Sequence, residues 1–197
     1  MSGSLTRVCV FAGSQRGLRP EYVAAAETLG RTLASRGIGV VYGGGRIGLM
    51  GVLADAALAA GGDVIGVIPR ALATREVAHD GLTHLHVVES MHERKALMAS
   101  LSEGFLALPG GWGTLEEFFE VLTWAQLGIH RRPCGLLNAG AYFDPLLAFL
   151  RHSADEGFVR PELNAMILVA DEPNRLIDLL AAYEPPRLVK WMDESRT

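Results

Sequence analysis

The sequence predicts an α/β fold, in which a mainly parallel β-sheet lies between two layers of helices. Two observations carry this prediction. Short runs rich in β-branched residues alternate with longer helical patterns along the whole chain. Several of these runs end in glycine-rich turns that lead into the next helix. Such alternation implies right-handed crossovers between parallel strands, with helices on both faces of the sheet.

The patterns place the elements as follows. Strands are expected at Arg7–Ala12, Ile38–Tyr42, Val64–Ile68, His84–Val88, Phe105–Leu108, Cys134–Leu137 and Met166–Val169. Helices are expected near Pro20–Arg36, Leu49–Ala60, Met91–Leu101, Leu115–Leu127, Pro145–Glu156 and Asn174–Ala182.

Local breakers set the limits of several elements. The first strand is followed by Gly13-Ser14, and the second ends at Gly43-Gly44-Gly45. Pro69 stops the third strand, because proline has no N–H to donate to a neighbouring strand. No internal repeat or low-complexity linker divides the chain. We therefore expect a Rossmann-like three-layer sandwich, a single domain over residues 1–197 with a peripheral tail at 184–197.

The composition excludes several classes of function. The chain has 197 residues, 49% hydrophobic and 20% charged, with a formal net charge of −4. This balance argues against a nucleic-acid partner, which needs clustered basic side chains. No run approaches the roughly 20 apolar residues of a membrane helix, and the N-terminal segment lacks an apolar signal core. We expect a soluble, cytoplasmic protein with neither a membrane nor a nucleic-acid partner.

No metal, disulfide or cofactor is expected. Cys9 and Cys134 lie within apolar runs and are interpreted as small core residues. His84 and His86 alternate on one strand, but no third metal ligand accompanies them.

The turn after the second strand has the spacing G-x-G-x-x-G, running through Gly43, Gly44 and Gly45. Glycines at such a junction let the backbone approach a phosphate and offer it N–H groups. A dinucleotide site also needs an acidic residue at the end of the next strand, but Asp63 precedes that strand. We expect phosphate contact here without a full NAD site; the alternative is a tight turn with no ligand.

The turn after the fifth strand, Pro109–Glu117 (PGGWGTLEE), is the most specific feature of the chain. Gly110, Gly111, Gly113 and Thr114 at the mouth of a helix can form a backbone nest for a phosphate, helped by the helix dipole.

Two carboxylates, Glu116 and Glu117, lie in the same turn. Thr114 and Glu117 have the spacing of a capping box, so Glu117 can be a simple helix cap. Carboxylates beside a phosphate site repel the ligand, however, and we therefore favour a functional role for Glu117.

The helix after the fourth strand begins with Ser90 and Glu93 at capping-box spacing, followed by Arg94 and Lys95. The dipole opposes cations at this end of a helix. Both cations are therefore expected to pair with an anion or a carboxylate, whereas His92 is interpreted as structural.

Two strings together, Met91–Ala96 (MHERKA) and Pro109–Glu117, resemble the LOG ("Lonely guy") family of cytokinin riboside 5′-monophosphate phosphoribohydrolases. Gly43–Gly51 and Leu122–His130 are also similar to that family, so the resemblance covers nearly the whole chain. It implies a Rossmann-like fold, a homodimer, and release of a free base and ribose 5-phosphate from a nucleotide.

The resemblance also implies roles for individual residues. It identifies Arg94 and Glu117 as the catalytic pair. The positions that look like substrate contacts are Glu76, Lys95, Thr123 and the turn Gly111–Glu117, which includes Leu115 and Glu116.

Two other functions stay open on the sequence alone. Related Rossmann-like proteins carry molybdenum cofactor, so a nucleotide or cofactor carrier without chemistry is the first alternative. Family members are often labelled lysine decarboxylases, which would require pyridoxal phosphate on Lys95. The pairing of Arg94 with Glu117 favours the hydrolase.

Overall fold

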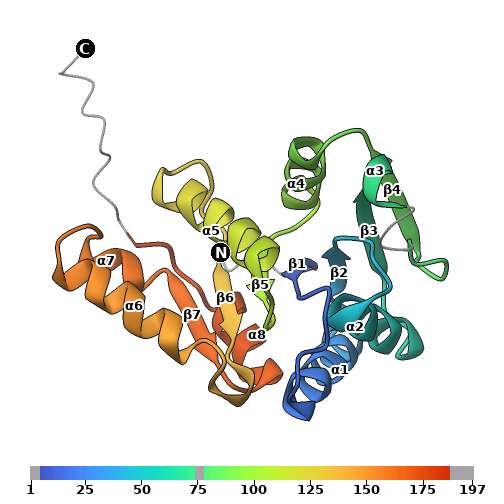
Figure 1. Cartoon of the computed structure of the whole chain (residues 1–197), viewed down its shortest axis with the longest axis horizontal. Coiled ribbons are helices and arrows are strands. Elements are labelled where there is room, and N and C mark those ends of the chain that lie inside the picture. The colour runs from blue at the N-terminus through green and yellow to red at the C-terminus, as the bar shows by residue number, and fades with distance from the viewer. Residues whose placement is uncertain (1–4, 74–77, 187–197) are drawn as a thin grey trace.

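The computed structural model describes residues 5–73 and 78–186. Seven strands form one sheet in the order β4-β3-β2-β1-β5-β6-β7, and every neighbouring pair is parallel (Figure 1). The strands are β1 (Arg7–Phe11), β2 (Gly39–Tyr42), β3 (Val64–Pro69), β4 (His84–Val88), β5 (Gly104–Ala107), β6 (Cys134–Leu137) and β7 (Ile167–Ala170). The helices are α1 (Pro20–Ser35), α2 (Gly48–Ala59), α3 (Arg70–Ala73), α4 (Met91–Ser100), α5 (Trp112–Gln126), α6 (Asp144–Asp155), α7 (Pro161–Asn164) and α8 (Pro173–Ala181), with a 3₁₀ turn η1 at Ala139–Ala141.

Helices cover both faces of the sheet. Side chains alternate between the faces of a strand, so Val8 and Val10 of β1 join one core cluster while Cys9 and Phe11 join the other. The first cluster packs under α1, α2 and α8, and the second packs under α4, α5 and α6. Figure 1 shows α4 and α5 above the sheet and α1 and α2 below it. The predicted three-layer fold is confirmed.

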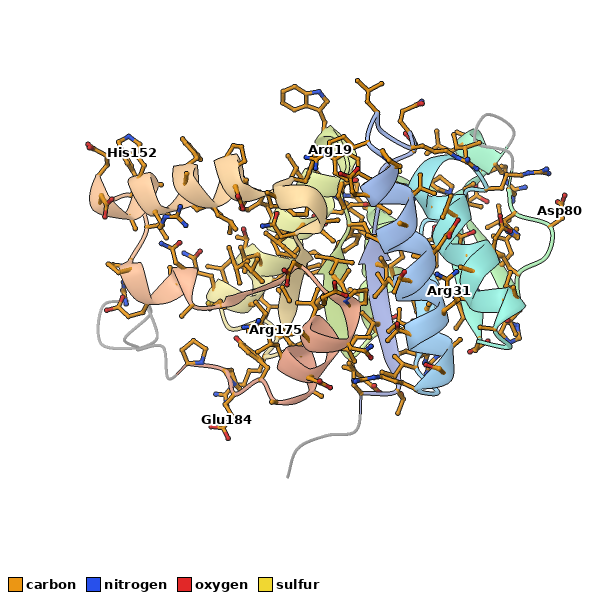
Figure 2. All side chains as sticks on the ribbon, turned by 90° about the horizontal axis from the view of Figure 1, so that it is seen from below. Arg19, Arg31, Asp80, His152, Arg175 and Glu184 are labelled. Carbon is orange, nitrogen blue, oxygen red and sulfur yellow. The ribbon has the colours of Figure 1, made fainter. Side chains whose placement is uncertain are left out.

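The strand order creates a switch point between β1 and β5. Strands β1 to β4 are laid down outward in one direction, and the chain then returns to place β5 on the other side of β1. The loops leaving β1 and β5 therefore diverge to opposite faces, and ligands of such sheets bind in the crevice that this leaves at the carboxyl ends. Arg19, in the loop after β1, lies at this edge of the sheet, the upper edge in Figure 2.

The structure differs from the predicted elements in three short helical segments that were not predicted and in the residue at which α5 begins. The four-residue helices α3 and α7 and the turn η1 are too brief to give a periodic signal. Helix α5 begins at Trp112, three residues before the predicted start. The seven strands lie where expected to within two residues. Of the predicted tail, Glu184–Pro186 carries no helix or strand and the rest lies outside the described residues.

Two further expectations concern exposure to solvent and membrane. Cys9 and Cys134 are buried and unbonded to each other, as expected of core residues. Within the described ranges, no helix combines the length and the apolar character needed to cross a bilayer.

Tyr42 on β2 provides a test of the core. Its ring is fully buried against α1 and α2, and its hydroxyl has no hydrogen-bond partner in the part of the chain that the structure describes. A buried, unpaired hydroxyl loses its bonds to water without replacement. Tyr42→Phe is therefore expected to raise the free energy of unfolding by about 1 kcal/mol in urea denaturation. A loss of stability would contradict this account of the hydroxyl.

Candidate active site

Three loops meet at the carboxyl edge of the sheet. The Gly13 N–H after β1 donates to the Pro109 carbonyl after β5 at 3.1 Å, and the Leu49 N–H after β2 donates to the Gly13 carbonyl at 2.9 Å. Gly48 has a φ of +62°, and a Cβ there would lie 2.2 Å from the Ser14 carbonyl carbon. The three loops are thus joined backbone to backbone.

An open hollow of about 570 Å³ lies beside this junction. It is lined by Ser14, Gln15, Arg16, Gly17, Leu18, Ile47 and Gly48. Ile47 and Gly48 belong to the glycine-rich turn after β2 for which phosphate contact was predicted, whereas the five residues from the loop after β1 were not predicted as part of a site. The available signal was Gly13-Ser14 directly after the first strand, but only the strand order shows that this loop lies beside the turn after β5.

The predicted phosphate turn is the N-terminus of α5. Gly111 is the N-cap, and no side chain caps the helix. Thr114 is buried, with its side chain packed so closely on Gly110 that a Cβ at 110 would lie 2.1 Å from Oγ1. The expected capping box of Thr114 and Glu117 is therefore wrong, because the helix starts three residues earlier and both residues lie inside it. Capping does not account for Glu117.

Gly111 and Gly113 lie beside open space. A Cβ at either position would meet no atom of residues 5–73 and 78–186 within 4 Å, and neither glycine has a positive φ. Glycine inside a helix costs about 1 kcal/mol relative to alanine, and nothing in the described chain requires it at 113. The first N–H groups of a helix have no intrahelical partner, so this opening gives an anion access to them.

Arg94 is buried at the floor of the site. Its Nε donates to the Val67 carbonyl within β3 at 3.1 Å, and its Nη2 donates to the Gly43 carbonyl after β2 at 3.2 Å. A Cβ on residue 43 would lie 1.9 Å from Nη2, so only glycine leaves room for the guanidinium. The predicted ligand contact of Gly43 stays a prediction, but its contact within the chain is with Arg94.

Glu117 faces Arg94 from α5. Its Oε1 lies 3.8 Å from Arg94 Nη1, and the two side chains are only 11% and 7% exposed. The helix that carries Arg94 begins as expected, since Ser90 Oγ accepts the Glu93 N–H at 3.1 Å. The structure thus brings together the two residues that the sequence assigned as a pair.

Cys9 on β1 lies close enough to Arg94 and Glu117 for their charges to act on the pKa of its thiol. Burial, and secondly the nearby Glu117 carboxylate, raise the pKa of the Cys9 thiol well above its usual value. Cys9 is therefore a neutral thiol in the floor of the site and not a nucleophile.

Lys95 lies beside the pair but points to other carboxylates. Its Nζ is 2.5 Å from Glu116 and 3.1 Å from Glu120, both on α5. Burial lowers the pKa of Lys95, but the hydrogen bonds and charges of these two glutamates outweigh it, and the net shift is upward. A lysine that forms a Schiff base must lose its proton, so this environment opposes the decarboxylase alternative.

The ligand contacts predicted for Gly44, Gly45, Thr123 and Glu76 stay predictions, and the structure gives the first three the following contacts within the chain. Gly44 turns the chain over β3 with a φ of +76°, and Gly45 pairs with Ala78 in an isolated bridge. The hydroxyl of Thr123 donates to the Phe119 carbonyl at 2.6 Å, about 15 Å along α5 from Gly113. Glu76 falls outside the described residues.

Solved structures show which known proteins share this fold. The molybdenum cofactor carrier protein of Chlamydomonas reinhardtii matches with a TM-score of 0.69 and 22% identity, covering 91% of this chain and 99% of the carrier. The molybdenum cofactor binding protein of Rippkaea orientalis matches with a TM-score of 0.66 and 24% identity, covering 89% and 94%. At these identities the likeness concerns the fold alone.

Sequence comparison is more specific. Residues 50–180 match a family model described as "Possible lysine decarboxylase". The cytokinin riboside 5′-monophosphate phosphoribohydrolase of Rhodococcoides fascians is 53% identical over 166 residues, 84% of each chain. The enzyme of that name from Arabidopsis thaliana, LOG7, is 48% identical over 91% of this chain and 82% of its own length. The chain therefore belongs to the LOG family, whose curated members bear the name cytokinin riboside 5′-monophosphate phosphoribohydrolase.

Proposed function

We propose that this protein hydrolyses the N-glycosidic bond of adenosine 5′-monophosphates, including those substituted at N6, and releases the free base and ribose 5-phosphate. The observation that carries the proposal is the buried pair of Arg94 and Glu117, placed one helical turn from the open N-terminus of α5. The names of relatives that are about half identical to this chain point to the same reaction.

The phosphate is held at the start of α5. The N–H groups around Gly111 and Gly113 and the positive end of the helix dipole attract a dianion, and the absence of side chains lets it approach. The loop after β1, joined to this turn through Gly13, contributes the adjoining hollow for the rest of the nucleotide.

Glu117 acts at the sugar. It lies four residues after Gly113, about 6 Å along the helix, and side chains of a helix lean toward its N-terminus. A phosphate bound at that terminus therefore holds the ribose over the carboxylate. As the base departs, positive charge builds on C1′ in an oxocarbenium-like state, which the carboxylate stabilises. It then accepts the proton of the attacking water, whose hydroxyl bonds to C1′, while the departing base takes up a proton from solvent.

Arg94 orients this carboxylate. Two backbone carbonyls fix the guanidinium, so its Nη1 edge presents a charge of fixed position to Glu117. Pairing with a cation favours the ionised form of a buried carboxylate, which is the form the reaction needs. The same guanidinium offsets the repulsion between Glu117 and the phosphate.

Replacing Glu117 tests the chemistry. In Glu117→Gln the side chain keeps its shape but loses its charge and basicity, and kcat is expected to fall by roughly 10²–10⁴-fold while KM changes little. The release of free base from AMP and from isopentenyl-AMP is measured by chromatography. Glu120→Gln on the same helix, which faces Lys95, is the matched control and should stay within a few-fold of wild type.

The outcomes separate the alternatives. If the wild-type chain binds AMP but releases no base, the protein is a carrier and the hydrolase proposal fails. If Glu117→Gln keeps wild-type turnover, the reaction does not use this carboxylate.

Replacing Gly113 tests the phosphate anchor. In Gly113→Ala a methyl group projects into the open space beside the helix N-terminus, so KM for AMP is expected to rise by about 10-fold or more. Because alanine favours a helix, the melting temperature should stay the same or rise. Steady-state kinetics and thermal unfolding check both effects together. An unchanged KM would place the phosphate elsewhere.

The enzyme is also proposed to work as a homodimer in the cytoplasm. The edge strand β4 exposes Leu85 and Val87, and the segment after α5 exposes Leu127 and Ile129. Apolar side chains in these places are typical of surfaces that a second subunit covers. Light scattering is expected to give twice the 21.2 kDa mass of one chain, and a single-chain mass at micromolar concentration would contradict the dimer.

A further inference from the structure

A tyrosine from a neighbouring loop contacts the phosphate turn. Tyr142, after β6, donates its hydroxyl hydrogen to the Gly110 carbonyl, after β5, at 2.6 Å. Because β5 and β6 are neighbours in the sheet, their carboxyl ends bring these loops together. The sequence offered no motif for this contact, and the proposed hydrolysis gives Tyr142 no role.

The backbone that presents Tyr142 is strained. Gly140 has a φ of 57° and Ala141 a φ of 60°, and the left-handed region costs an alanine roughly 1–2 kcal/mol. Hydrogen bonds around these two residues hold the conformation in place. Arg19 Nη1 donates to the Gly140 carbonyl at 2.8 Å, the Ala141 N–H donates to the Asn138 carbonyl at 3.2 Å, and the Phe143 N–H donates to Asn138 Oδ1 at 2.7 Å. Strain that the surroundings maintain in this way is typical of functional sites.

The ring of Tyr142 is also fixed. It packs edge-to-face against Tyr22 of α1 at 5.5 Å and against Phe143 at 5.0 Å between ring centroids. The Arg19 guanidinium in turn lies 5.6 Å from the Tyr22 ring centroid. The hydroxyl therefore reaches Gly110 from a rigid support that involves the loop after β1 as well as the loop after β6.

We propose that Tyr142 is a positioning residue for the phosphate site, an inference that rests on the proposed function of that site. The Gly110 carbonyl and the Gly111 N–H belong to one planar trans peptide and point in opposite directions. Holding the carbonyl toward Tyr142 turns the N–H away from it, toward the open N-terminus of α5. Between two glycines this peptide would otherwise rotate readily, and a carbonyl turned toward the ligand would repel its phosphate.

Removing one oxygen atom tests this role. Tyr142→Phe keeps the ring contacts and loses only the hydroxyl. KM for AMP is expected to rise by about 10-fold with kcat within a few-fold, and the preference for AMP over adenosine in kcat/KM should fall by a similar factor. Inorganic phosphate, titrated by calorimetry or as a competitive inhibitor, should bind about 10-fold more weakly. A purely structural role would lower the melting temperature and leave the AMP-to-adenosine preference unchanged.

The matched control is Tyr42→Phe. It also removes one tyrosine hydroxyl, but this hydroxyl has no hydrogen-bond partner in the described chain and takes no part in the support of Tyr142, so the phosphate preference should persist. Wild-type phosphate affinity and AMP preference in Tyr142→Phe would overturn the inference. Failure of the proposed function is a different result, because the wild-type protein would then release no base. Titration of the wild-type protein and of Tyr142→Phe with inorganic phosphate would still test the role of Tyr142.

Discussion

The position of the Arg94 guanidinium is the constraint on which the site depends. It donates hydrogen bonds to the carbonyls of Val67 in β3 and Gly43 after β2, and it faces a carboxylate on α5. Arg94 of α4 therefore links two neighbouring strands to a second helix. A buried charge of this kind needs hydrogen-bond acceptors and a counter-charge, and the carbonyls of Val67 and Gly43 together with the Glu117 carboxylate supply them. The arginine thus requires glycine at position 43, and the backbone carbonyls of β3 and of the turn after β2 hold the arginine side chain in position.

The two cations at the start of α4, Arg94 and Lys95, pair with different carboxylates of α5. Arg94 turns inward to the sheet and to Glu117, the proposed catalytic carboxylate, whereas Lys95 turns to Glu116 and Glu120. Both lie where the helix dipole opposes them, and α5 supplies the compensating negative charge. Helix α5 therefore carries the proposed phosphate site at its N-terminus, and its glutamates neutralise the two cations of α4.

Local patterns predicted most of the fold and the central pair. Alternation of strands and helices, and the strings around Arg94 and Glu117, are signals that a single stretch of chain contains. The strand order is not, because it depends on pairing between distant segments, and without it the loop at Ser14 could not be placed in the site. The early start of α5 was missed since Gly-Trp-Gly has low helix propensity. Tyr142 was missed because a left-handed alanine leaves no mark in the sequence.

The backbone contacts among the three loops also bear on how related enzymes can differ. Gly48 touches the loop after β1, and Gly13 bonds to the loop after β5, so an insertion in any one of them would displace the other two. Surface loops generally tolerate insertions, but these contacts lead us to expect that the lengths of the three loops vary little. What remains free are the outward side chains at the mouth, Leu18, Ile47 and Trp112, all exposed to solvent. Divergence in the choice of base can proceed by exchanging such side chains on an unaltered frame.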